Sequence, residues 1–179
     1  ILCHIINIDV LKNASLNILN IFNTYGLVDI NNIVDELSIL VNKKMDCIPS
    51  LKKLKELTGN TLIVSVTNAS KCRPEYFSYD TAPNLSCIDA IKMSCNYPIF
   101  FQRIIYKNDI YVDGGLTDNL PISCVDDGVS KILVLRVQGI KTENLSFVSY
   151  INRLMSMPIH EIENLHIKNL GDNCTILEI

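Results

Sequence analysis

The chain has 179 residues with a formal net charge of −3, and 48% of the residues are hydrophobic. This length suits one domain with a substantial core, and a second domain is not expected. The charge balance lacks the basic excess of nucleic-acid-binding proteins, so no nucleic-acid partner is predicted. No apolar run approaches the roughly 20 residues that cross a bilayer, so no transmembrane segment is expected in this sequence.

Seven cysteines are present, an odd number, and no pair has the Cys-x-x-Cys spacing. Free thiols in a reducing compartment are therefore favoured over a disulfide framework. The chain starts with neither a basic leader nor a small-residue cleavage site, so no signal peptide is expected. These features predict a cytoplasmic protein whose association with membranes, if it has any, is peripheral.

Helical periodicity dominates the first third of the chain. Residues 1–8 are predicted to be the end of a buried helix, and residues 13–22 a second helix. A third, amphipathic helix is entered from Asp29. Its apolar residues recur at spacings of three and four: Ile30, Ile33, Val34, Leu37, Leu40 and Val41. Ser50 is placed to cap a short helix that ends at Gly59.

Strands are predicted where β-branched and aromatic residues cluster. Residues 61–67 are predicted to form a buried strand, and residues 76–79 a second, shorter strand. Ser86 then caps a helix in the capping-box arrangement, with the acidic Asp89 three residues later. That helix must stop before Pro98, because the residue preceding a proline avoids helical backbone angles.

The remaining elements alternate between strand and helix. Residues 103–106 and 110–112 form a predicted hairpin that turns at 107–109. The elements after it are a short helix from Pro121 to Gly128, a strand at 132–135 covered on both faces, helices at 145–155 and around Ile162 and Leu165, and a last strand at 174–179. This alternation predicts a layered α/β domain with a mostly parallel sheet.

Asp113 follows the second hairpin strand and is itself followed by Gly114 and Gly115. The two glycines remove side-chain bulk and allow a ligand or a loop to approach the carboxylate. In an enzyme, such a carboxylate accepts a proton from a nucleophile or orients a base. The competing interpretation is that Asp113 only stabilises a turn through its own backbone, a common role for aspartate before glycine.

The residues around Asp113 belong to a longer motif. A helix ends in Ser94-Cys95-Asn96-Tyr97-Pro98-Ile99-Phe100-Phe101, the hairpin follows, and Asp113-Gly114-Gly115 then leads to Asn119 and Pro121. This order resembles the patatin-like phospholipases, in which a Ser-x-x-x-Pro-x-x-Phe segment precedes a hairpin, an Asp-Gly-Gly or Asp-Gly-Ala loop and an Asn-x-Pro step. The resemblance covers roughly residues 1–138. Residues 139–179 carry C-terminal helices and a final strand, and no recognised motif.

The resemblance implies a three-layer α/β/α fold and a lipid acyl hydrolase that uses a Ser–Asp dyad. Asp113 would be the proton acceptor, and Gly114 and Gly115 would shape its loop. A serine hydroxyl is a weak nucleophile until a nearby base accepts its proton, which is the role implied for Asp113. The implied substrates are phospholipid or acylglycerol esters at a membrane or lipid-droplet surface, and no cofactor or catalytic metal is implied.

The sequence departs from the family pattern at the nucleophile. The family's serine lies in a Gly-x-Ser-x-Gly turn, and no serine of this chain has glycines at both flanking positions. The family's Gly-rich oxyanion loop is also missing. We therefore expect an N-terminally truncated domain that begins shortly after the nucleophile and is inactive alone. Ser94 and Ser65 are interpreted as packing or capping residues, not as substitutes.

Two other functions stay open. In the first, the chain is a non-catalytic remnant that binds a lipid surface or a protein. In the second, it is a metal-dependent hydrolase that uses Asp113 with Asp118. Asp126 and Asp127 would join them around a divalent cation, because clustered carboxylates suit hard metal ions.

Two further sets of residues near the motif have competing interpretations. Cys95 and Cys124 lack a neighbouring histidine that would activate them as nucleophiles. Tyr97, Phe100 and Phe101 either line an acyl pocket or pack in the core.

Overall fold

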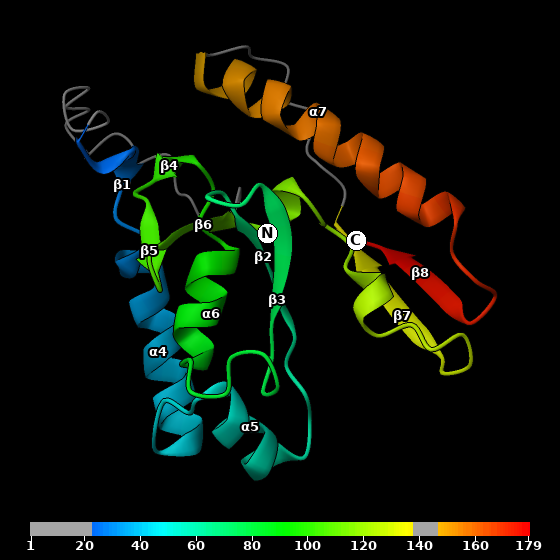
Figure 1. Cartoon of the computed structure of the whole chain (residues 1–179), viewed down its shortest axis with the longest axis horizontal. Coiled ribbons are helices and arrows are strands. Elements are labelled where there is room, and N and C mark those ends of the chain that lie inside the picture. Colours follow the sequence, from blue (N-terminus) through cyan, green and yellow to red (C-terminus); the bar gives the residue numbers. More distant parts are fainter. Residues whose placement is uncertain (1–22, 138–146) are drawn as a thin grey trace. The chain divides into compact units, whose positions relative to one another are not determined.

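A computed structural model describes residues 23–137 and 147–179 (Figure 1). The chain divides into two compact units, Ile1–Gly114 and Gly115–Ile179. The helices predicted at 1–8 and 13–22 lie outside the described residues.

Three helices of the first unit lie within the described residues. They are α4 (Asn31–Met45), α5 (Leu51–Thr58) and α6 (Cys87–Ser94). The Ser50 hydroxyl accepts the N–H of Lys53 at the start of α5, and the Ser86 hydroxyl accepts the N–H of Asp89 at the start of α6. Gly59 ends α5 in the left-handed conformation. The three helices predicted in this region are therefore confirmed.

The apolar face predicted for α4 can be compared at five of its six positions, because the side chain of Ile33 lies outside the described part of the structure. Ile30 and Val34 are buried, and Leu37 and Val41 pack against the same cluster. Leu40 is instead 63% exposed. It lies roughly 90° around the helix from the centre of the stripe that the other four residues form, so the helix does not turn it toward the core.

The main sheet of the first unit is antiparallel. Its strands are β2 (Val64–Asn68), β3 (Arg73–Phe77), β5 (Ile104–Tyr106) and β6 (Asp109–Asp113), in the order β3-β2-β6-β5. Lys107 and Asn108 connect β5 to β6, and both have positive φ, as a type I′ hairpin turn requires. A separate parallel pair joins β1 (Gly26–Val28) to β4 (Ile99–Phe101). The predicted hairpin is confirmed, and Asp113 is the last residue of its second strand.

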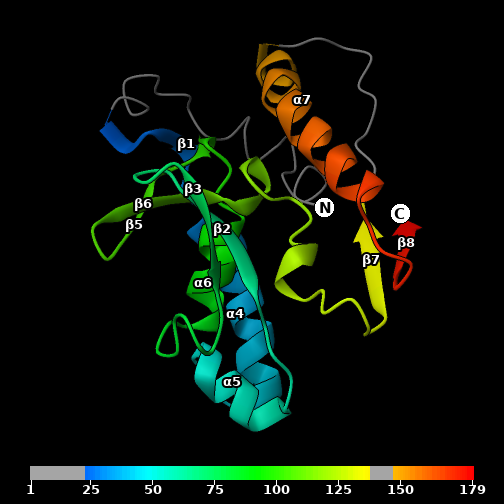
Figure 2. The same cartoon turned by 45° about the vertical axis from the view of Figure 1, so that its right-hand side comes forward.

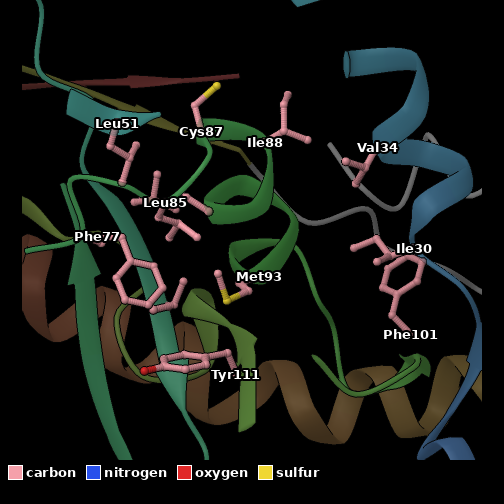
Figure 3. Close-up of a cluster of buried hydrophobic side chains, with 14 of the residues drawn as sticks. Ile30, Val34, Leu51, Phe77, Leu85, Cys87, Ile88, Met93, Phe101 and Tyr111 are labelled. Atoms are coloured by element: carbon pink, nitrogen blue, oxygen red, sulfur yellow. The ribbon is translucent and has the colours of Figure 1, made fainter. Parts of the chain in front are cut away.

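The core of the first unit packs α6 against β2 and β6 on one side and against α4 on the other (Figures 1 and 3). Met93 of α6 is 1% exposed, and it lies near the rings of Phe77 and Tyr111, whose centroids are 5.3 Å apart. Burying a side chain of this size contributes about 1.5–3 kcal/mol. The cluster therefore anchors α6 on the strand that carries Asp113.

The second unit combines a parallel strand pair with one long helix (Figure 2). Its elements are η1 (Gly114–Leu116, shared with the first unit), η2 (Ile122–Cys124), β7 (Ile132–Arg136), α7 (Phe147–Lys168) and β8 (Cys174–Glu178). The guanidinium of Arg136 on β7 contacts Glu163 of α7 at 3.1 Å and Glu178 of β8 at 3.3 Å. This arginine therefore ties the three largest elements of the unit together.

The predicted break between two helices in this unit is wrong. The helix expected at 145–155 is described from Phe147 onward, and it continues through the segment around Ile162 as one helix, α7, with Pro158 inside it. A proline inside a helix costs about 3 kcal/mol, partly because it leaves a carbonyl unpaired. That carbonyl belongs to Leu154, which is 41% exposed and so lies on the side of the helix that faces water. Beyond Pro158, Glu163 of the helix contacts Arg136 of β7 at 3.1 Å.

Two other predictions for the second unit need correction. The strand at 132–135 is confirmed, but in the structure Leu133 and Leu135 are 64% and 55% exposed, so only one face of β7 is covered. The helix expected from Pro121 to Gly128 is reduced to the three residues of η2. The final strand is confirmed as β8.

The described residues form a mixed α/β chain, as predicted in outline. The four-stranded sheet is wholly antiparallel, however, and parallel pairing is confined to two two-stranded ladders. Short connections explain two of the three antiparallel pairings. Residues 69–72 between β2 and β3, and the two-residue turn between β5 and β6, are too short for the crossover that parallel neighbours need.

Candidate active site

Asp113 is held at the end of β6 through both of its peptide groups. Its backbone N–H donates to the carbonyl of Asn96 at 2.9 Å, and its carbonyl accepts the Thr67 hydroxyl at 2.8 Å. Asn96 lies just after α6 and is 1% exposed, and Thr67 lies on β2 and is 6% exposed. Asp113 itself is half-buried. The backbone that carries the carboxylate is therefore fixed from two elements.

Gly114 is buried and packs directly on β2. A Cβ at this position would lie 2.2 Å from the carbonyl oxygen of Ser65 and 2.8 Å from its hydroxyl oxygen. Any side chain would force the loop away from the strand, so glycine is required here for steric reasons. The loop role predicted for Gly114 thus has a physical cause, while that of Gly115 stays a prediction.

A polar network that the sequence patterns did not indicate lies two residues before Asp113. Asn68 is fully buried, and its Nδ2 donates to the Tyr111 hydroxyl at 3.2 Å and to Glu75 at 3.1 Å. The Tyr111 hydroxyl in turn donates to Glu75 at 2.8 Å. Burial and the bond to Glu75 raise the pKa of Tyr111 above its usual range, so its hydroxyl stays a donor at neutral pH. A shift in register between β2 and β6 would therefore leave the buried polar atoms of Asn68 and Tyr111 without hydrogen-bond partners.

The residues considered as replacement nucleophiles do not suit that role. Burial raises the pKa of the Cys95 thiol to about 11, and the negative charge of Asp113 adds to the shift. The thiol is therefore protonated at neutral pH and is a poor nucleophile. Ser94 is the last residue of α6, and Ser65 lies within β2 against Gly114. Both positions agree with the packing interpretation.

The reactivity of the cysteines tests directly how well the residues around α6 are packed. Cys47 and Cys72 are exposed, whereas Cys87 is buried. The pKa of Cys95 is raised from 9.0 to about 11, which leaves roughly 100-fold less thiolate at this residue near neutral pH. We expect iodoacetamide to modify Cys47 and Cys72 well before Cys87 and Cys95, as measured by mass spectrometry of timed digests. In denaturant all four should react at similar rates, and equal rates in the native protein would contradict the packing around α6.

The other aspartates have structural roles of their own. Asp126 accepts the N–H of Gly128, and Asp127 accepts the N–H and hydroxyl of Ser130. These bonds from Ser130 lower the pKa of Asp127 to about 2. Among residues 23–137 and 147–179, no three His, Cys, Asp or Glu side chains gather closely enough to hold a metal ion.

Asp118 and His166 meet within the second unit. Asp118 is 5% exposed, and its Oδ1 lies 3.6 Å from Nδ1 of His166 on α7. No sequence motif indicated this contact, because α7 lies beyond the segment that carries the motif.

The aromatic residues before the hairpin pack in the core. Phe100 and Phe101 are 7% and 3% exposed and belong to the core cluster of the first unit. Tyr97 packs against Phe100, with ring centroids 5.7 Å apart. This arrangement favours the packing interpretation over an acyl pocket.

Comparisons with known proteins place this geometry in context. The sequence model described as Patatin-like phospholipase matches residues 5–125. The protein named "Probable lipid hydrolase 463L" of Invertebrate iridescent virus 6 is 36% identical over 101 residues, which are 56% of this chain and 35% of that protein. An uncharacterised protein of Acanthamoeba polyphaga mimivirus is 26% identical over 126 residues, 69% of this chain and 40% of that protein.

Solved structures are also similar, and VipD is one of them. The crystal structure of VipD from Legionella pneumophila matches 72% of this chain and 29% of VipD, with 20% identity and a TM-score of 0.46. The present chain therefore spans well under half the length of these relatives.

Proposed function

This chain belongs to the patatin-like phospholipase family, and on that basis we propose that the whole protein hydrolyses phospholipid or acylglycerol esters through a Ser–Asp dyad to which this chain contributes Asp113. The reaction class is carboxylic ester hydrolysis, and the biological role is lipid catabolism. The complete domain would have the three-layer α/β/α arrangement with a mostly parallel sheet.

In the proposed reaction, Asp113 takes the proton of a serine hydroxyl as its oxygen attacks the ester carbonyl. The serine then carries the acyl group until water releases it. A carboxylate can act as this base without a histidine when a closed, poorly solvated site raises its proton affinity. Gly114 and Gly115 shape the loop that presents it.

The observation that carries this proposal is the way Asp113 is held. A carboxylate that only capped a turn would need no support beyond its own loop. Here the peptide groups on both sides of Asp113 bind two buried residues, Asn96 after α6 and Thr67 on β2, and Gly114 packs against Ser65. Such support is expected of a group that must be positioned for chemistry.

The nucleophile is proposed to lie outside these residues. The 179 residues contain no Gly-x-Ser-x-Gly turn, and the chain covers 35% and 40% of its two viral relatives. We therefore propose that the serine and the oxyanion loop belong to residues other than these 179. Those residues would lie either in the same polypeptide or in a separate one.

We propose that the protein acts at a lipid surface. A lipid hydrolase meets its substrate at a membrane or lipid droplet, and we propose that this protein binds there peripherally. In the described residues, the structure contains no helix with both the length and the apolar character needed to span a bilayer.

The test compares residues 1–179 with the protein expressed from its full reading frame. Both are assayed on a short-chain ester and on phospholipid vesicles, and both are treated with a fluorophosphonate, which labels activated serines. We expect turnover and labelling only in the longer protein, with the label on a serine outside these 179 residues. Labelling of Ser65 or Ser94 would overturn the proposal.

The same samples separate the alternatives. No turnover and no labelling in the longer protein would favour a non-catalytic remnant that binds a lipid surface or a protein. Turnover that a chelator abolishes would favour a metal-dependent hydrolase using Asp113 with Asp118. Turnover unaffected by the chelator, with a labelled serine, supports the dyad.

A further inference from the structure

Asn96 binds two groups on the same edge of β6. Its side-chain Nδ2 donates to the carbonyl of Tyr111 at 3.1 Å, and its backbone carbonyl accepts the N–H of Asp113 at 2.9 Å. Asn96 is 1% exposed. The side-chain amide and the backbone carbonyl of this buried asparagine both bind β6. Asn96 therefore makes the hydrogen bonds that a residue of a neighbouring strand would make.

The pairing of β6 shows why such a substitute is needed. The N–H of Ala69 donates to the carbonyl of Ile110, so Ile110 faces β2. Polar backbone groups alternate along a strand, so the carbonyl of Tyr111 and the N–H of Asp113 face the opposite edge. On that edge β5 pairs with β6 only as far as Ile104, which lies opposite Tyr111. Asn96 continues the ladder to Asp113, where β5 has ended.

Thr67 secures the other side of Asp113. The chain leaves β6 for η1 at this point, and the Asp113 carbonyl accepts the Thr67 hydroxyl at 2.8 Å. Thr67 is 6% exposed, so this bond is shielded from water. The two peptide groups that flank the Asp113 Cα are thus bound to two buried residues, Asn96 just after α6 and Thr67 on β2.

We propose that Thr67 and Asn96 are positioning residues for the proton transfer by Asp113, an inference that rests on the proposed function. Proton transfer needs the base within about 2.6–3.2 Å of the proton's donor atom. Displacing a catalytic group by about 1 Å can lower the rate roughly 100-fold. Neither residue touches the substrate in this proposal, and both act through the backbone of Asp113.

The decisive variant is Thr67→Val in the protein expressed from its full reading frame. Valine keeps the shape and β-branching of threonine but cannot donate to the Asp113 carbonyl. We expect kcat for a short-chain ester to fall roughly 10- to 100-fold, with KM nearly unchanged, because the base moves while the binding surface does not. Thr67→Ser restores the hydroxyl and should recover most of kcat.

A matched control removes a similar bond elsewhere. The Thr81 hydroxyl donates to the carbonyl of Tyr76 at 2.7 Å, in the loop after β3. Thr81→Val should leave kcat unchanged even where it lowers the melting temperature. Asn96→Leu provides a second variant, since leucine is also branched at Cγ, although larger, and lacks the amide donor to Tyr111. All rates are taken below the lowest melting temperature of the set.

The outcomes distinguish this inference from the proposed function. An active Asp113→Ala protein would overturn the proposed function itself. An inactive Asp113→Ala protein combined with wild-type kcat in folded Thr67→Val and Asn96→Leu would overturn only the positioning role. Equal losses in Thr67→Val and Thr67→Ser would also overturn it, because the hydroxyl would then not be responsible.

Discussion

Replacing Asp113 with asparagine is expected to lower kcat of the full-reading-frame protein by roughly 10²- to 10⁴-fold, the range that general-base catalysis contributes. An amide has the shape of the carboxylate but cannot take up the serine proton. The bonds to Asn96 and Thr67 involve only the backbone of residue 113, so they survive the change. Initial rates on a short-chain ester and a thermal melt of the same sample measure both effects.

The control for this prediction is Asp113→Ala. Asparagine before a glycine can deamidate to aspartate, so Asp113→Asn preparations regain activity as they age. Alanine cannot regenerate a carboxylate, and Asp113→Ala therefore sets the floor for the rate. Retained turnover in Asp113→Ala, with an unchanged melting temperature, would contradict the role of Asp113 as the base.

The features that the sequence predicted well are those determined by neighbouring residues. Ser50 and Ser86 cap helices through N–H groups two or three residues away, and the hairpin before Asp113 turns on Lys107 and Asn108. Asp113 itself was located at a strand end because its strand, its turn and its glycines lie within a dozen residues. Each of these signals is complete within a short window, so no knowledge of the fold is needed to interpret it.

The features that were missed depend on partners distant in sequence. The Thr67 hydroxyl binds a carbonyl 46 residues later, and β2 pairs with β6 across a similar separation. The α7 helix, which continues through Pro158, contacts Arg136 through Glu163, and these two residues lie 27 positions apart. The steric need for glycine at 114 arises from Ser65, on a strand with no local relation to the Asp-Gly-Gly motif. Such constraints become visible only when the strands are paired.

Gly114→Ala is expected to damage both the fold and the site. The added Cβ would lie 2.2 Å from the backbone oxygen of Ser65, and a backbone atom cannot rotate away as a side chain can. Relief requires β6 or the loop after it to shift, which costs about 1–3 kcal/mol or more. For a domain of 150–250 residues each kcal/mol lowers the melting temperature by about 2–4 °C. Because Asp113 is adjacent, the same shift should lower kcat roughly 100-fold.

Gly59→Ala is the control that separates the effect of backbone strain on stability from the effect of moving Asp113. Gly59 has a φ of +72° and open space around its Cβ position, so alanine there is strained but meets no neighbouring atom. This variant should lose stability through its backbone angle, by about 1 kcal/mol, and keep its turnover. If Gly114→Ala retained full kcat at a temperature where both variants are folded, the loop would not need its contact with Ser65 to place Asp113. A loss confined to Gly114→Ala instead ties turnover to the position of one backbone segment, independently of any change to the carboxylate.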